Sequence, residues 1–320
     1  QTFIAEGAGR FLEGMVSDAI WNDITHFEGN ANAFRLLAHR YKGRREGGFV
    51  MTYSTLASIV KYPYSSAYAG HKGKFGFFCS EKELFQRIAD EMGIIKVSED
   101  GEPLKYVRHP LVYLVEAADD ICYEIMDIED SHKLKILSFE ETKEALLSFF
   151  DEETRINIEK RIIEEDITDK NEQIVYMRAC AIGTLEHECA QAFIHNEKAI
   201  LEGTLKGSLI EHISEKMSKA YRHCSDISWK KIYRSKPVLD VELAGYKIMN
   251  TLMEQMIEAV THPDRYYSKQ LICRVSSQYD IDSPDLETRI MAVIDYISGM
   301  TDVYALDVYQ KINGISLPIV

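Results

Sequence analysis

The sequence predicts an all-α fold, and three observations support this prediction. Apolar residues recur every three or four positions through most of the chain, which is the period of an amphipathic helix. Many of these segments begin at a residue that caps helices and end at glycine or before proline. We find no internal repeat, no low-complexity tract and no sustained strand alternation, although a short hairpin could form near 48–53 or 74–79.

The first helices are expected within 31–41 and 54–63. The stretch "ANAFRLLAHRY" places its large apolar residues at helical spacing. The stretch "STLASIVKYP" offers Ser54 or Thr55 as a cap and stops before Pro63. Both segments therefore read as short helices that lead into a loop.

Two further helices carry a capping-box pattern, in which a serine is followed three residues later by glutamate. Ser80 and Glu83 form this pattern in "SEKELFQRIADEMGI", which we expect to end near Gly93. Ser138 and Glu141 repeat it in "SFEETKEALLSFF".

A long helix is expected from Pro110, in "HPLVYLVEAADDICYEIMDIEDSHKL", because proline is favoured in the first turn. The clearest irregular stretch is "VKYPYSSAYAGHKGKFGFF", rich in Gly, Tyr and Ser. No Pro/Gly-rich linker divides the chain, and the only candidate domain boundaries are the loops expected near 150–170 and 226–238. The later helical segments are 170–200, 207–224, 238–260 and 284–312.

Composition describes a globular chain of 320 residues, 46% hydrophobic and 28% charged. No apolar run reaches the roughly 18 residues of a membrane helix, and "QTFIAEGAGRFLEG" lacks signal-peptide character. The six cysteines are scattered, as is typical of reduced thiols, so we expect a cytoplasmic protein without membrane contact. A net charge of −14 argues against nonspecific coating of nucleic acid, but it leaves an anionic small substrate open.

The long helix places acids and one tyrosine on a shared face, since each residue turns about 100° around the helix axis. A solvated acidic surface would explain this pattern. A buried metal or phosphate site is the alternative, and it would need further ligands from elsewhere. The residues on this face are Glu116, Asp119, Tyr123, Asp127 and Asp130.

Four stretches together resemble a known family. They are "HFEGNANAFRLL" (26–37), "VKYP" (60–63), "HPLVYLVEAADDICYEIMDIED" (109–130) and "IDYISGMTDVYAL" (294–306). In this order the chain resembles the bacterial deoxyguanosinetriphosphate triphosphohydrolases of the HD-domain superfamily over almost its whole length. The resemblance implies a helical HD-type core within 1–150 and a helical region at 151–320 that completes the site and the oligomer interface.

The resemblance also implies roles for residues of the long helix. Asp119 is similar to the last metal ligand of the HD site. Tyr123 and Asp127, one and two turns later, are similar to residues that hold the deoxyribose and its 3′-hydroxyl.

Further substrate residues are implied outside this helix. Asn30 of "FEGN" matches a substrate-contacting residue, and Lys61 and Lys74 match lysines that bind the triphosphate. Glu242 lies in a motif similar to one that completes the site, from a neighbouring subunit. The ammonium of a lysine suits a compact polyanion such as a triphosphate.

The implied activity is metal-dependent hydrolysis of a dNTP, foremost dGTP, to a deoxynucleoside and inorganic triphosphate, with Mg²⁺ or Mn²⁺ as cofactor. The implied partners are copies of the same chain, in a hexamer for example, and a single-stranded DNA or nucleotide effector. Two alternatives stay open: a catalytically inactive nucleotide-binding homologue, or another HD-type nucleotide phosphohydrolase.

One departure from the family pattern stands out, because the sequence contains no His-Asp dipeptide. Of the metal ligands only Asp119 has a counterpart here. We therefore expect the remaining ligands and the catalytic proton-transfer residues upstream of residue 1. The stretch around His187 and His195 is not expected to bind a metal, because its spacing differs from HExxH.

Overall fold

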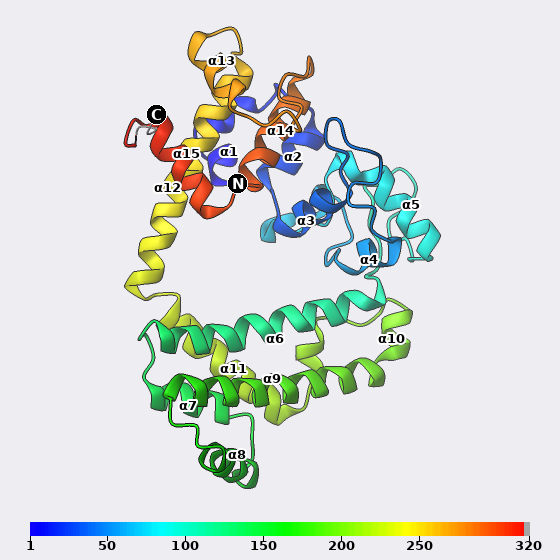
Figure 1. The fold of residues 1–320 in the computed structure, drawn as a ribbon. Helices are drawn as coiled ribbons and strands as arrows, with labels where there is room; N and C mark the ends of the chain where they lie inside the picture. Colours follow the sequence, from blue (N-terminus) through cyan, green and yellow to red (C-terminus); the bar gives the residue numbers. More distant parts are fainter. Residues whose placement is uncertain (317–320) are drawn as a thin grey trace. The chain divides into compact units, whose positions relative to one another are not determined.

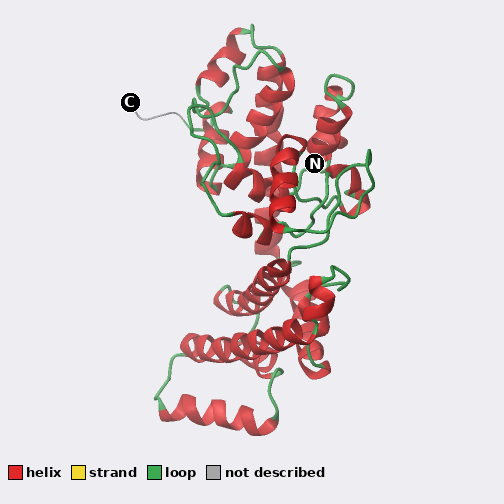
Figure 2. Cartoon of the chain, turned by 90° about the vertical axis from the view of Figure 1, so that its right-hand side faces the viewer, coloured by secondary structure: helices red, strands yellow, loops and turns green. Residues whose placement is uncertain are grey.

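The computed structural model describes residues 1–316, and these fold as helices joined by loops (Figure 1, Figure 2). The all-α prediction is confirmed. Extended pairing within the described residues is limited to three isolated bridges: Tyr64 with Lys105, Ser65 with Phe77, and Lys96 with Tyr106. The expected hairpin near 48–53 or 74–79 is therefore wrong, because 48–53 runs from a turn into the start of α4 and 74–79 contains only the bridge residue Phe77.

The chain divides into two compact units, Gln1–Val107 together with the chain from Glu242 onward, and Arg108–Val241. This division differs from the boundary at residue 150 that the family resemblance implied. The helix α12 (Lys236–Thr261) belongs to both units, since its first residues lie in the second and the rest in the first. Each unit is described here by itself.

The first unit is built from short helices and tight turns. Its α-helices besides α12 are α1 (Thr2–Ala5), α2 (Asp18–Thr25), α3 (Gly29–Ala38), α4 (Tyr53–Ser58), α5 (Lys82–Met92), α13 (Tyr266–Cys273), α14 (Leu286–Ser298) and α15 (Asp302–Ile312). Its 3₁₀ turns are η1 (Ala8–Leu12), η2 (Ser66–Tyr68), η3 (Gly70–Lys72) and η4 (Cys79–Glu81).

The second unit contains the long helices. It holds α6 (Pro110–Lys133), α7 (Phe139–Leu147), α8 (Glu152–Glu164), α9 (Lys170–His195), α10 (Glu197–Leu201), η5 (Leu209–His212), α11 (Glu215–Ile227) and the π-helical turn η6 (Ser228–Ile232). In Figure 1, α6 and α9 run alongside each other, with α7 and α11 against them.

Each unit has its own core of buried apolar side chains. In the second unit, Ile121, Ile125 and Ile128 of α6 are buried with Met177 and Leu185 of α9. Burying one such side chain contributes about 1.5–3 kcal/mol. This packing holds α6 by one face and leaves its opposite face open.

The first unit has two buried clusters. One joins the α1–α2 region to α12 and α14 through residues such as Leu12, Ile24, Leu252 and Ile290. The other is aromatic and packs Phe77 against Phe85, with ring centroids 4.6 Å apart. Because Phe75, Phe77 and Phe78 are all buried, the irregular loop that contains them is anchored to both clusters.

Several predicted helix ends are confirmed. Ser138 and Glu141 form the complete capping box of α7. Gly93 ends α5 in the left-handed region, with φ +66°. Pro110 occupies the first turn of α6, and the ring of His109 accepts a hydrogen bond from the backbone N–H of Leu111.

Other predicted ends are wrong. The capping box at Ser80 and Glu83 does not form, because the Ser80 hydroxyl donates to Glu81 and accepts from Arg35 instead. The cap of α4 is Thr52, two or three residues earlier than expected. The supposed boundary at 150–170 contains α8, capped by Asp151.

Three predicted segments are each divided, and the segment 170–200 forms α9 and α10. The segment 284–312 forms α14 and α15, which separate at Gly299, where an added Cβ would lie 3.1 Å from the Tyr279 hydroxyl. The segment 207–224 forms η5 and then α11. No helix within residues 1–316 combines the length and apolar character that a bilayer crossing requires.

Candidate functional site

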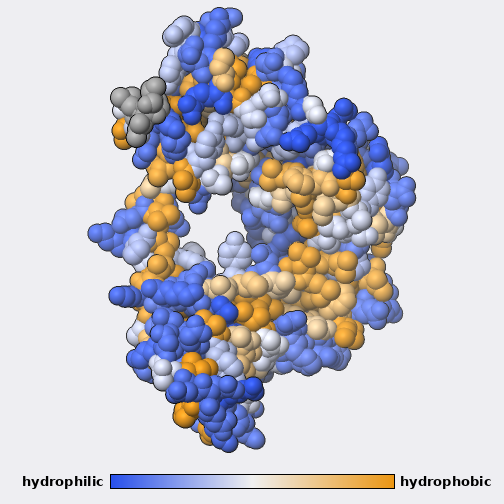
Figure 3. Space-filling view, viewed as in Figure 1, coloured by the Kyte–Doolittle hydropathy of each residue, from blue (hydrophilic) through white to orange (hydrophobic). Residues whose placement is uncertain are grey.

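One face of α6 is open and carries Asp119 and Tyr123. Both side chains are exposed, and 67% of the Tyr123 surface is accessible. Leu111, Leu114 and Val115, in the first turns of the same helix, are apolar and also exposed. Apolar side chains gather along α6 in the space-filling view (Figure 3). A carboxylate beside an aromatic ring on an apolar strip suits a ligand that has both a charged and an apolar part.

The other acids of α6 are tied to partners in their own unit. Glu116 is buried and lies 2.9 Å from Arg108, so it does not share the open face as the helical angles had suggested. Glu129 is 1% exposed and pairs with Arg178 and Lys133. A buried carboxylate is stable when cations or donors satisfy it, and these pairs are therefore structural.

Asp127 is half-buried and accepts a hydrogen bond from the hydroxyl of Tyr233, 2.5 Å away. Burial and the Asp127 carboxylate both raise the pKa of Tyr233, which keeps the hydroxyl protonated and donating. On the next turn back, Glu124 accepts from Ser225 and Ser228, and burial raises its pKa. The end of α11 and the residues that follow it thus hold this part of α6.

In the first unit, the two segments that carry Lys61 and Lys74 pack directly on each other. Gly76 lies so close to the Tyr62 backbone that an added Cβ would overlap the carbonyl oxygen of Tyr62. The N–H of Gly76 donates to the Tyr64 carbonyl at 3.1 Å. Only glycine fits at such an approach, so the "KGKFG" sequence brings the two lysine segments together.

Lys74 also contacts the "FEGN" segment. Its ammonium lies 2.7 Å from Glu28 Oε1, and the same oxygen accepts from the Asn30 side-chain amide at 2.9 Å. Glu28 itself is 4% exposed, whereas Lys74 is 44% exposed. Asn30 and Lys74, 44 positions apart in the numbering, thus share one buried carboxylate.

Asp23 of α2 binds two further residues of the loop region that contains Lys61 and Lys74. Its carboxylate is 1% exposed and accepts from the Ser66 hydroxyl and from the Cys79 N–H. Burial raises the pKa of Asp23, and the two hydrogen bonds oppose that rise. His26, beside this region, donates from Nδ1 to the Asn22 carbonyl, which agrees with a structural role.

The remaining predicted residues lie at the surface of the first unit. The Lys61 ammonium lies 5.9 Å from the centre of the Tyr62 ring. Glu242 is an exposed residue of α12, and its apolar neighbours Val241 and Leu243 are exposed as well.

Two groups therefore emerge among the predicted residues. Asn30 and Lys74 meet at Glu28, and the Lys61 segment packs beside Lys74. Asp119, Tyr123 and Asp127 line successive turns of α6 in the second unit. Their assembly into one site remains a prediction. Sequence reasoning missed Glu28, Asp23 and Tyr233, although Glu28 stands inside the quoted "FEGN" motif.

A metal that the family resemblance implies would need more ligands than the described part of the chain brings together. Within residues 1–316, no group of three or more His, Cys, Asp or Glu side chains is arranged to hold a metal ion. Asp119 supplies one carboxylate, and a divalent cation takes several ligands. The described residues thus do not form a complete metal site.

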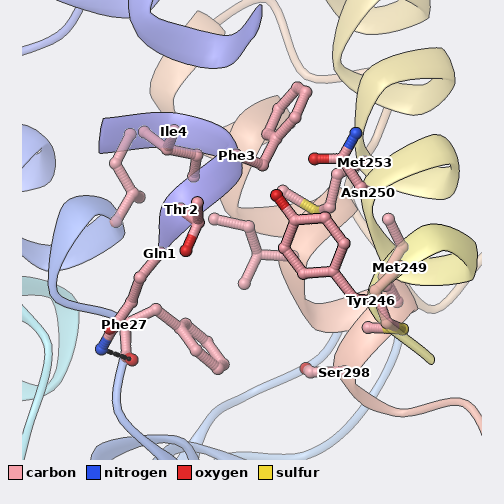
Figure 4. Close-up of a pocket in the computed structure, with 13 residues that line it drawn as sticks. Gln1, Thr2, Phe3, Ile4, Phe27, Tyr246, Met249, Asn250, Met253 and Ser298 are labelled. Atoms are coloured by element: carbon pink, nitrogen blue, oxygen red, sulfur yellow. Dashed lines mark hydrogen bonds between the residues drawn. The ribbon is translucent and has the colours of Figure 1, made fainter. Parts of the chain in front are cut away.

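A pocket of about 220 Å³ lies in the first unit and is mainly apolar (Figure 4). Its walls come from α1, α12 and α14, with Phe27, and Gln1 crosses one end by donating to the Phe27 carbonyl at 2.7 Å. None of the side chains that line it is charged. These side chains offer nothing to neutralise a triphosphate, and none of the predicted site residues is among them.

Comparison with known proteins identifies the family. A protein of Pseudomonas aeruginosa (strain LESB58), called deoxyguanosinetriphosphate triphosphohydrolase-like, is 30% identical over 327 residues, covering 99% of this chain and 72% of the relative. A protein of the same name from Synechocystis is 33% identical over 307 residues, covering 92% and 67%. The chain belongs to the deoxyguanosinetriphosphate triphosphohydrolase-like family.

Two further matches agree with this assignment. The deoxyguanosinetriphosphate triphosphohydrolase of Yersinia enterocolitica is 25% identical over 342 residues, covering 92% of this chain and 65% of the relative. Residues 212–311 match the phosphohydrolase-associated domain. This stretch runs from the end of η5 into α15 and contains Tyr233 and Glu242.

Proposed function

We propose that this member of the deoxyguanosinetriphosphate triphosphohydrolase-like family hydrolyses dNTPs, with dGTP as the first candidate, to a deoxynucleoside and inorganic triphosphate. Water adds its oxygen to the α-phosphorus, the bond from phosphorus to the 5′-oxygen breaks, and a proton passes to the 5′-oxygen. The observation that carries the proposal is the similarity to triphosphohydrolase-like relatives along nearly the whole chain.

Each of the two residue groups, taken by itself, suits binding of one part of such a substrate. The loops that carry Lys61 and Lys74 offer cations for a polyphosphate, which an acidic protein needs locally. The face of α6 offers Tyr123 as a flat surface for a sugar and Asp127 as an acceptor for a hydroxyl. We assign Asp119 the role of one ligand of a divalent cation, Mg²⁺ or Mn²⁺.

Product identity tests the proposal. Purified intact protein is incubated with Mg²⁺ and dGTP, and the nucleoside products are separated by chromatography. Deoxyguanosine as the first product supports the proposal, whereas dGMP or dGDP would assign the protein to a different phosphohydrolase class. Absence of any product from all four dNTPs, singly and mixed, would favour a binding-only homologue.

We further propose that the protein acts as a homo-oligomer in which Glu242 completes the site of a neighbouring copy. Exposed apolar residues around Glu242, namely Leu239, Val241, Leu243 and Tyr246, suit a subunit interface better than a solvated helix. Light scattering after size exclusion gives the mass directly. A strictly monomeric protein with full activity would contradict this part of the proposal.

Changing Tyr123 to alanine should relax the preference for deoxyribose. A ring packed under the sugar leaves little room for a 2′-hydroxyl, and removal of the exposed ring opens that space. We expect the ratio of kcat/KM for dGTP over GTP to fall by about tenfold or more, since one steric contact of this kind is worth about 1–3 kcal/mol. An unchanged ratio would remove Tyr123 from the sugar site.

Changing Tyr233 to phenylalanine should weaken the binding of substrates that carry a 3′-hydroxyl. The Tyr233 hydroxyl orients Asp127, and a hydrogen bond to a charged group is worth about 1.5–3 kcal/mol. Because Tyr233 is partly exposed, we expect a smaller effect, a rise of about fivefold in the KM for dGTP. The control substrate is 2′,3′-dideoxy-GTP, whose KM should stay constant. Equal rises for both would show that the sugar hydroxyl is not involved.

A further inference from the structure

Glu28 is a buried carboxylate with more partners than its place in the helix requires. As the residue before α3 it accepts from the backbone N–H of Asn30, which is a capping role. Helix caps favour Ser, Thr, Asp and Asn, because their short side chains already reach that N–H. The longer glutamate also reaches the Asn30 amide and the Lys74 ammonium with its other oxygen.

The carboxylate fixes the orientation of Asn30. A carboxylate only accepts hydrogen bonds, so the amide of Asn30 must present its NH₂ group to Glu28. The amide carbonyl oxygen of Asn30 then points away from Glu28. An asparagine without this partner would flip between donor and acceptor at the same place.

The carboxylate also fixes the end of Lys74. A lysine with an exposed side chain samples many rotamers, and holding it requires a partner at its charged end. Glu28 Oε1 lies 2.7 Å from that end, while 44% of the Lys74 side chain stays accessible. An ammonium has three N–H donors, so this contact leaves the others for an anion.

We infer that Glu28 is a positioning residue that orients Lys74 and Asn30 for binding of the triphosphate group. The inference rests on the proposed function for the identity of the anion, but its geometry depends only on residues of the first unit. Glu28 touches no substrate atom in this account and acts through its two partners.

Two substitutions separate positioning from capping. Glu28→Asp keeps the charge and a favoured cap but is too short to reach Lys74. Glu28→Gln keeps the length but places an amide nitrogen, itself a donor, against the donors of Asn30 or Lys74. The matched control is Glu129→Gln, a buried carboxylate of the second unit that also binds a lysine.

The readout is calorimetric binding of inorganic triphosphate and, separately, of deoxyguanosine to the intact protein. We expect both Glu28 variants to bind triphosphate about tenfold more weakly, the scale of one well-placed charge contact. Deoxyguanosine binding should change by less than about twofold in Glu28→Asp, and Glu129→Gln should bind triphosphate as the unchanged protein does.

A double-mutant cycle completes the test. In a Lys74→Gln background, Glu28→Asp should cause no further loss of triphosphate binding, because its partner is already gone. Unchanged triphosphate binding in a folded Glu28→Asp variant would overturn the inference. So would an equal loss for triphosphate and deoxyguanosine, which indicates general damage.

The proposed function can fail independently of this inference. If the unchanged protein releases no triphosphate from any dNTP yet binds inorganic triphosphate through Glu28 and Lys74, the anion site stands and the reaction is wrong. If the unchanged protein binds no triphosphate at all, the inference itself is overturned.

Discussion

Replacing Asp119 with alanine should abolish metal-dependent turnover of dGTP by the intact protein. Asp119 is the exposed carboxylate at the head of the Asp119–Tyr123–Asp127 series on α6. Changes to residues that only support a metal ligand already reduce activity or affinity by about 10–100-fold, so loss of a ligand should exceed a hundredfold. The measurement is kcat/KM for dGTP across a titration of Mg²⁺ or Mn²⁺.

Asp130→Ala is the matched control, because Asp130 is another exposed acid of α6 whose nearest cation is Lys133 at 3.5 Å. It should retain activity within about twofold, as expected of a surface substitution. Asp119→Ala with normal turnover would remove the metal assignment. Equal losses in both variants would indicate a general dependence on the charge of α6.

Replacing Arg35 with alanine should produce the largest loss of stability. Arg35 is 4% exposed on its side chain and binds both oxygens of Asp295, at 2.7 and 2.8 Å, while Nη1 lies 2.6 Å from Glu81. Burial opposes the charged form, but these carboxylates raise the pKa of Arg35 above its ordinary value. Without Arg35, two buried carboxylates lose their shared cation.

We expect the free energy of unfolding to fall by about 3–5 kcal/mol, which is the usual effect of breaking a buried ion pair on one side. Denaturant unfolding monitored by circular dichroism measures this change. Lys42→Ala is the control, since its pairs with Asp280 and Asp282 are exposed and screened by solvent. An Arg35→Ala protein as stable as the Lys42→Ala protein would contradict the role of this network.

Local sequence signals predicted those features that depend on neighbouring residues. The capping box of Ser138 and Glu141, and the end of α5 at Gly93, involve contacts within a few residues. The same pattern failed at Ser80, because Arg35, 45 positions earlier, competes for the serine hydroxyl. A local pattern cannot reveal such a distant partner.

In the candidate site, too, the sequence did not reveal contacts between residues that are far apart in the chain. Helical spacing alone places Asp119, Tyr123 and Asp127 on successive turns, and the resemblance supplies their expected roles. The partner of Asp127 is Tyr233, 106 positions later, and the partner of Lys74 is Glu28, 46 positions earlier. Those contacts arise from tertiary packing and became visible only in the structure.

The division into two units could not be predicted from the sequence. The first unit is discontinuous and resumes within α12, where no change in composition marks the boundary. Because the boundary lies inside a helix, no loop-forming residues mark it in the sequence.

Phosphorus NMR of the intact protein with Mg²⁺ and each dNTP, in water enriched in ¹⁸O, tests the central claim most directly. The proposal predicts free triphosphate as the first phosphorus-containing product, with ¹⁸O on a terminal phosphorus that was the α-phosphorus of the substrate. Pyrophosphate or orthophosphate as the first product would contradict the claim. Triphosphate without ¹⁸O would contradict attack at phosphorus.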